Sequence, residues 1–144
     1  HDPDSGFIAA IHAGWRGVEN EIVRKTAIAL KAKGSDLRRA QAWIGPHIGV
    51  KSFEVGLDVA KKLEDRLDAV RGYTQDTTAL FPHPDPEKKY VDLSIIARAQ
   101  LQSCGIERER TIELAIDTVQ SEAHESFRRD KSTAGRQVSF IALK

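Results

Sequence analysis

Residues 8–17, with the sequence IAAIHAGWRG, are the stretch around which the rest of this chain is organised. The small and β-branched apolar residues over 7–12 predict a buried strand, which ends at His12. The glycine at position 14 leaves the backbone open to a ligand, and Arg16 then leads into a helical pattern. Helix N-termini attract anions, and a histidine can bind a metal or transfer a proton. The stretch therefore predicts a corner of an active site, although the same pattern is also typical of an ordinary strand-to-helix connection.

Hydrophobic periodicity and turn residues predict the other elements. We expect helices over 18–33, 57–70 and 93–104, the last one capped by Asp92, and strands over 40–44, 79–81, 111–116 and 137–143. Three glycines and a proline in 45–56 predict a shaped loop, and the proline-rich segment 72–89 predicts a surface loop with a solvent-facing His83. Strands and helices alternate early but not late, so we expect one α+β domain over 1–144, with a mixed β-sheet layered with α-helices.

Composition excludes several classes of protein. The net charge of +1 gives no reason to expect nucleic acid or a membrane surface as a partner. No apolar run approaches the length of a membrane span, and the polar first residues do not resemble a signal peptide. Cys104 is the one cysteine, so it cannot form a disulfide within the chain; it falls on an apolar helix face. These features favour a cytoplasmic protein.

Three blocks of sequence stand out in this order: HAGWRG at 12–17, IGPHIG at 44–49 followed by SFEVG at 52–56, and SFRRD at 126–130 followed by GR at 135–136 and FI at 140–141. In this order they resemble the YfiH/YlmD family of bacterial laccase-domain or "polyphenol oxidase" proteins. The resemblance runs from about residue 2 to the C-terminus. Members of this family are mostly assigned as purine nucleoside phosphorylases that also deaminate adenosine, and the resemblance implies a YfiH-like fold.

The resemblance also implies a metal site. In the family, a histidine, a cysteine and a second histidine hold zinc or, in some preparations, copper, and His12 corresponds to the last of the three. The other two ligands precede this stretch in the family, and the chain contains no methionine. We therefore expect residues 1–144 to be the C-terminal part of a longer YfiH-like domain. Three protein ligands and a water molecule would form an open catalytic zinc site.

Four more residues are candidates for binding substrate or phosphate. Arg16 stands beside the expected helix start, where it could bind phosphate or form an ordinary surface salt bridge. Arg128 and Arg129 lie in a cationic segment that the resemblance makes a candidate anion site and that composition alone would assign to a solvated face. His47, in the glycine loop, could line the pocket or simply be exposed.

The chain departs from the family at two places where cysteines are frequent, Lys51-Ser52 and Asp117-Thr118. These losses argue against a copper-rich oxidase, as do the five scattered histidines, since a multicopper laccase needs about ten. The favoured function is zinc-dependent phosphorolysis of adenosine, inosine or guanosine, with adenosine deamination as a side activity; the expected partners are a purine nucleoside and phosphate. The alternatives are a copper-dependent polyphenol oxidase, an amidase-like hydrolase of a cell-wall precursor, and a metal-free, non-catalytic fragment.

Overall fold

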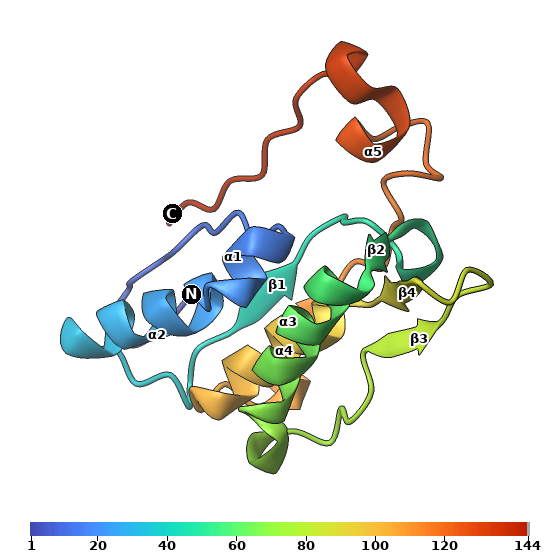
Figure 1. Ribbon diagram of the computed structural model, residues 1–144. Coiled ribbons are helices and arrows are strands. Elements are labelled where there is room, and N and C mark those ends of the chain that lie inside the picture. The colour runs from blue at the N-terminus through green and yellow to red at the C-terminus, as the bar shows by residue number, and fades with distance from the viewer. Residues whose placement is uncertain (144) are drawn as a thin grey trace.

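The computed structural model describes residues 1–143 and has the expected mixed α+β architecture (Figure 1). The helices are α1 (Trp15–Glu19), α2 (Ile22–Ala32), α3 (Leu57–Asp68), α4 (Leu93–Ser103) and α5 (Phe127–Asp130). The strands are β1 (Ala42–Ile44), β2 (Glu54–Gly56), β3 (Leu80–Pro82), β4 (Lys88–Val91) and β5 (Thr111–Glu113). Short 3₁₀ turns occur at Val50–Ser52, Arg71–Tyr73, Arg108–Arg110 and Lys131–Thr133.

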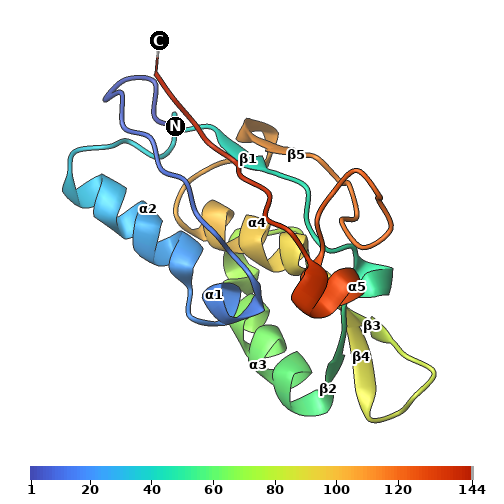
Figure 2. The ribbon, with the colours of Figure 1, turned by 90° about the horizontal axis from the view of Figure 1, so that it is seen from above.

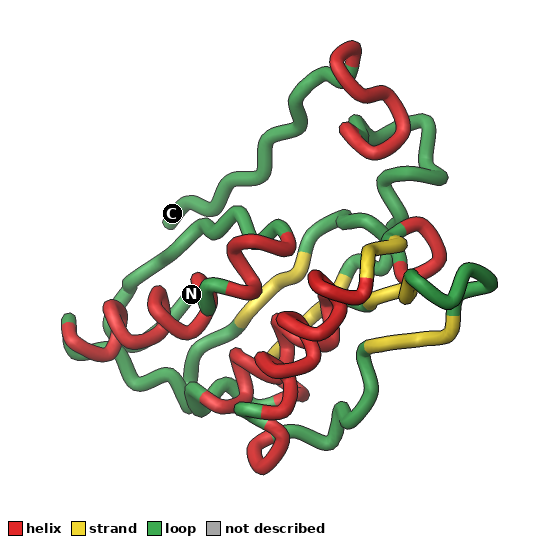
Figure 3. Tube along the Cα trace, in the orientation of Figure 1, coloured by secondary structure: helices red, strands yellow, loops and turns green. Residues whose placement is uncertain are grey.

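The strands form two small sheets. β1 pairs with β5 in parallel, with Trp43 opposite Ile112, while β2, β4 and β3 form an antiparallel sheet in that order. Seen from above, β1 and β5 run along one side of the molecule with α2 and α4 next to them (Figure 2). The tube view shows how much of the chain is loop, including most of the segment around α5 (Figure 3).

Two clusters of buried apolar side chains hold these elements together. The first is centred on Val18, Leu63 and Ile96, which are fully buried, and therefore joins α1, α3 and α4. The second lies between α2 and the end of α4 and includes Leu37 and Cys104. The expected burial of Cys104 on an apolar helix face is confirmed.

The expected helix at 93–104 is confirmed as α4, and its ends show why it forms there. The carboxylate of Asp92 accepts hydrogen bonds from the backbone N–H groups of Ser94 and Ile95, which satisfies the first free donors of the helix. Gly105 follows with a φ of 98°, a left-handed conformation that ends a helix at little cost for glycine. The helix expected over 57–70 is also confirmed, as α3.

The single helix expected over 18–33 is wrong, because the chain forms two helices there. α1 begins earlier, at Trp15, and Glu21 then adopts a left-handed φ of 57° before α2 begins. The break turns α1 so that Val18 reaches the first cluster and its carbonyl accepts a hydrogen bond from Gln100 at 2.9 Å. Periodicity could not reveal this break, since α1 and α2 each have an apolar face.

The strands expected over 7–12 and 137–143 are not formed. Both segments are extended, but neither takes part in a ladder with the other described residues. The segment 137–143 returns from α5 between residues 6–12 and β1 (Figure 2). A strand needs a hydrogen-bonded neighbour as well as a favourable sequence, and that neighbour is what these segments lack within residues 1–143.

The segment 72–89 is more ordered than expected. The strand expected over 79–81 is present as β3, and β4 pairs with it as a hairpin that the sequence did not indicate. The expectation that His83 faces solvent is wrong: its side chain is 10% exposed, packs against the Tyr90 ring at a tilt of 55°, and lies 3.0 Å from the Glu54 carboxylate. Among residues 1–143 no helix is long and apolar enough to cross a membrane.

Candidate functional site

His12 and Arg16 stand at the two ends of the turn that enters α1. The His12 side chain is exposed and folds back over Gly14, where a β-carbon would come within 3.3 Å of its Nε2. The Arg16 guanidinium lies 4.7 Å from the centre of the Trp15 ring and pairs with no carboxylate within residues 1–143. Both side chains are therefore accessible at the start of α1, and the backbone of Gly14 between them carries no side chain that would cover them.

This corner and the glycine loop rest on the same apolar core. Trp15 from the start of α1 and Ile48 from the loop both pack against the first cluster, which also contains Phe53. The three sequence blocks that carry the family resemblance thus converge, because the Arg128 guanidinium of the third block lies 5.4 Å from the centre of the Phe53 ring.

The loop 45–56 is fastened to the segment that follows β5. The N–H of His47 donates to the carbonyl of Ile116 at 3.1 Å, and the N–H of Thr118 donates to the carbonyl of His47 at 3.0 Å. The Ser52 hydroxyl donates to the Asp117 carboxylate at 2.6 Å. A β-carbon on Gly49 would lie 2.6 Å from Asp117 Oδ2, so only glycine allows this close approach.

The Asp117 carboxylate is stabilised in its charged form. Burial by itself would raise its pKa, but hydrogen bonds from the Ser52 hydroxyl and from the N–H groups of Gly49, Val119 and Gln120 outweigh this effect. The pKa of Asp117 is therefore below its ordinary value. Ser52 and Asp117 occupy the two places at which this chain departs from the cysteines frequent in the family, and the structure brings these places into contact.

The His47 imidazole is held at both of its nitrogens. Nδ1 lies 2.8 Å from the carbonyl oxygen of Gly45, and Nε2 lies 3.4 Å from Glu113 Oε1. Glu113 is in turn bound by Arg98, which also contacts Asp76. To bind substrate, His47 would have to give up one of these contacts, and its proposed substrate contact stays a prediction.

The two arginines of the third block differ sharply. Arg129 donates to the carbonyls of Thr118, Val119, Ser121 and His124 at 2.8–3.1 Å and also pairs with Asp130. Its guanidinium N–H groups are therefore taken up by the carbonyls of the turn 118–124 and by the Asp130 carboxylate. Arg128 makes one hydrogen bond, from Nη1 to the carbonyl of Glu54 at 3.1 Å, and no ion pair with a described carboxylate. Of the pair, Arg128 has donors left for an anion.

The described residues do not form a complete metal site. Within residues 1–143, no three side chains of histidine, cysteine, aspartate or glutamate are grouped so that they could hold a metal ion. His12 supplies one nitrogen donor at an exposed position, and Cys104 is buried in the second cluster. The residues present therefore do not by themselves fit the three-ligand zinc centre that the resemblance implies.

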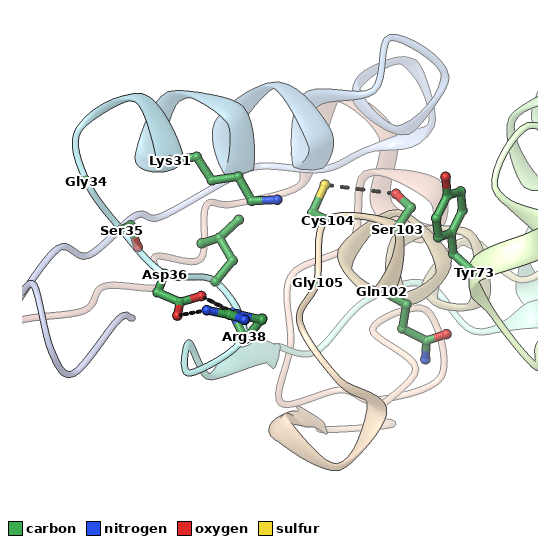
Figure 4. A pocket seen from close by; sticks show the side chains of 11 residues that line it. Lys31, Gly34, Ser35, Asp36, Arg38, Tyr73, Gln102, Ser103, Cys104 and Gly105 are labelled. Carbon is green, nitrogen blue, oxygen red and sulfur yellow. Dashed lines mark hydrogen bonds and ion pairs between the residues drawn. The ribbon is translucent and has the colours of Figure 1, made fainter.

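A shallow hollow of about 550 Å³ lies elsewhere, between the ends of α2 and α4 (Figure 4). Lys31, Tyr73 and Cys104 contribute to its lining, and none of the candidate site residues does. Its one guanidinium, that of Arg38, is bound by the Asp36 carboxylate at 2.7 Å. The hollow is therefore separate from the candidate residues of the three blocks.

Sequence reasoning missed the residues that shape the loop. Glu113 and Asp117 carry no motif, and their partners His47 and Ser52 are 65 or 66 positions away in the chain. The sequence offered one signal for these contacts: at positions 51–52 and 117–118 the chain lacks the cysteines that are frequent in the family.

The family comparison supports the three-block resemblance. The sequence profile described as "Multi-copper polyphenol oxidoreductase laccase" matches residues 1–144. "Purine nucleoside phosphorylase YfiH" of Shigella flexneri is 35% identical over 136 residues, which is 94% of this chain and 51% of that protein. The protein of the same name from Escherichia coli K12 is 34% identical, with the same coverage. "Adenosine deaminase RL5" from an unknown prokaryotic organism is 28% identical over 78% of this chain and 40% of that protein.

Solved structures agree on the fold. The crystal structure of Bacillus licheniformis hypothetical protein YfiH superposes with a TM-score of 0.80 at 23% identity and covers 91% of this chain and 48% of that one. YlmD of Geobacillus stearothermophilus gives a TM-score of 0.72 at 24% identity, over 86% of this chain and 44% of that one. The chain spans about half the length of the curated relatives it matches. The chain thus belongs to the multi-copper polyphenol oxidoreductase laccase family, as the YfiH-like sequence blocks and fold together show.

Proposed function

We propose that this chain provides the anion-binding part of a purine nucleoside phosphorylase. The observation that carries the proposal is a pair of arginines, Arg16 and Arg128, that stack on aromatic rings packed in or against one core cluster. Neither arginine pairs with a carboxylate of the described residues. The names of the relatives from Shigella flexneri and Escherichia coli support a nucleoside and phosphate as substrates.

The stacking suits phosphate recognition. A guanidinium that lies over a ring keeps its edge N–H groups free, and these groups match two phosphate oxygens at once. In Arg128 the hydrogen bond to Glu54 fixes one end of the guanidinium and leaves the other donors free. Arg129 instead donates its hydrogen bonds to the carbonyls of the turn 118–124. If Arg129 bound phosphate, it would have to give up some of these hydrogen bonds.

The proposed reaction is a substitution at the anomeric carbon of the ribose. A phosphate oxygen forms a bond to this carbon, the bond to the purine nitrogen breaks, and the purine leaves with the bonding electrons and takes up a proton. The arginines would hold the phosphate and screen its charge as it approaches the sugar.

Zinc is part of the proposal only through His12. We propose that its imidazole gives one ligand to a zinc ion, or to copper, whose remaining ligands come from outside the described residues. When bound, the metal would activate water for the deamination of adenosine. The relative named adenosine deaminase favours that side activity as a second candidate. Polyphenol oxidation and hydrolysis of a cell-wall precursor have no specific support among the described side chains.

The test is release of hypoxanthine from inosine, followed by chromatography with and without phosphate. It is run on residues 1–144 and on the same residues joined to the unmatched half of Escherichia coli YfiH. We expect phosphate-dependent release by the joined protein, lost in His12→Ala. Arg128→Ala should lower kcat/KM about 10–100-fold, the effect of losing one or two charge-assisted hydrogen bonds.

Arg24→Ala is the matched control, because Arg24 is an exposed arginine on α2 that pairs with Glu21 and lies outside all three blocks. Its activity should equal that of the unaltered protein. If the joined protein is folded and releases no base from inosine or adenosine with phosphate present, the phosphorylase proposal is refuted. Equal losses in Arg24→Ala and Arg128→Ala would refute the specific role of Arg128.

A further inference from the structure

The β1–β5 sheet has one covered face and one bare apolar face. Side chains alternate along a strand, and Ala42 packs on the second cluster while Glu113 reaches Arg98 on α4. The neighbouring positions therefore point away from the helices. Trp43, Ile112 and Leu114 are 50%, 53% and 51% exposed on that outer face.

A second bare apolar edge lies beside this sheet. In the segment 137–143, Val138 is 83% and Phe140 is 87% exposed. Ser139 between them lies near Gly45 at the end of β1, where its Oγ would be 3.9 Å from a β-carbon on the glycine. Figure 1 shows this segment running back from α5 toward the N-terminal part of the chain. Within residues 1–143, the N–H and C=O groups of the segment 137–143 form no hydrogen bond with other backbone groups.

Physical chemistry disfavours leaving such a surface bare. Parallel sheets are normally covered on both faces, and a two-stranded parallel sheet has little stability of its own. Extended segments with free N–H and C=O groups readily accept a further strand. Large apolar side chains gathered on one surface mark an interface more often than a solvated face.

We propose that Trp43, Ile112, Leu114, Val138 and Phe140 form a docking surface for a polypeptide of the kind that makes up the unmatched half of the relatives. That polypeptide would cover the outer face of β1–β5 and supply the hydrogen-bonded neighbour that 7–12 and 137–143 lack. These two segments would then become strands, as their sequences predict. The proposal concerns assembly and is independent of the reaction catalysed.

The relatives give the reason for this occupant. This chain aligns over 91% of its length with the Bacillus licheniformis structure but accounts for only 48% of it. In the Shigella protein the matched part is 51% of the sequence. A similar length of polypeptide therefore accompanies this fold in its relatives. A second copy of this chain would bring only the same helices and the same unpaired segments, and it is the opposing occupant of this surface.

The test is binding of residues 1–144 to the unmatched half of Escherichia coli YfiH, supplied as a separate, affinity-tagged polypeptide by co-expression. We expect a 1:1 complex by light scattering. Hydrogen exchange in 7–12 and 137–143 should be slower than in the chain alone by on the order of tenfold or more. Ile112→Arg should abolish the complex.

Ile28→Arg is the matched control, because Ile28 is 51% exposed on α2, against 53% for Ile112. It should leave the complex intact. The proposal is overturned if the two folded polypeptides do not associate, or if Ile112→Arg and Ile28→Arg weaken the complex equally. It is also overturned if residues 1–144 form a dimer that Ile112→Arg dissociates, since the surface would then belong to a second copy.

Discussion

Replacement of Gly49 by alanine tests how the loop 45–56 is held against the segment after β5. The new β-carbon would lie 2.6 Å from Oδ2 and 2.8 Å from Cγ of Asp117, which is closer than real β-carbons approach. The Asp117 side chain would have to move, and its 2.6 Å hydrogen bond from Ser52 and 2.9 Å hydrogen bond from the N–H of Val119 would be strained or lost.

The size of the effect follows from these contacts. A hydrogen bond to a charged group contributes about 1.5–3 kcal/mol, and crowding of a packed site costs about 1–3 kcal/mol. Asp117 is only partly buried, so solvent recovers some of its lost hydrogen bonding. We expect Gly49→Ala to lower the free energy of unfolding by about 2 kcal/mol, measured by urea denaturation with circular dichroism.

Two further variants make the reasoning refutable. A β-carbon on Gly72 would contact nothing within 4 Å, and Gly72 does not have a positive φ, so Gly72→Ala should change stability by less than about 0.5 kcal/mol. In an Asp117→Ala background Oδ2 and Cγ are gone and only the β-carbon of residue 117 remains, 3.0 Å away, so Gly49→Ala should then cost less than it does in the unaltered chain. An undiminished cost in that background would show that the loop is held by something other than the contact with Asp117.

Three more predictions follow from the described contacts. Leu63→Ala, in the fully buried centre of the first cluster, should cost about 2–5 kcal/mol of unfolding free energy; a cost below about 1 kcal/mol in urea denaturation would contradict the core assignment. Asp92→Ala removes the acceptor for two N–H groups and should cost about 1 kcal/mol, measured in the same way, whereas Asp92→Asn should retain most of the stability. The pKa values of Asp117 and Asp2 are below their ordinary values, for Asp2 chiefly through hydroxyl hydrogen bonds from Ser5 and Ser35. Their stabilising effect is therefore fully present above about pH 4 and is lost as the pH falls through the lower folded-state values, so Asp2→Asn should flatten the acid limb of the stability–pH curve.

The Asp2 interaction also shows what sequence patterns do not contain. Asp2 is buried and its carboxylate accepts hydrogen bonds from the Ser35 hydroxyl at 2.7 Å and the N–H of Asp36 at 3.2 Å, across more than thirty positions. From the sequence, residues 2–6 and 35–39 are two unrelated polar turns. Because nothing local links them, only the folded chain reveals that one carboxylate joins both.

The sequence by itself determined the elements whose cause is local. α4 could be predicted because Asp92 caps it, its apolar residues repeat at helical spacing, and Gly105 ends it. The family could be recognised because its three blocks keep their order and spacing, and the profile and fold comparisons confirm it. The candidate residues His12, Arg16 and Arg128 also came from those blocks.

Only the tertiary structure decided the features that depend on distant partners. It separated Arg128, which keeps free donors, from Arg129, whose donors are taken up by one turn and by Asp130, although the two are adjacent in the chain. It also left 7–12 and 137–143 extended without a ladder, despite strand-like sequences. The physical reason is the same in each case: caps and periodicity act within a few residues, whereas a guanidinium or a strand is defined by the groups that the fold brings against it.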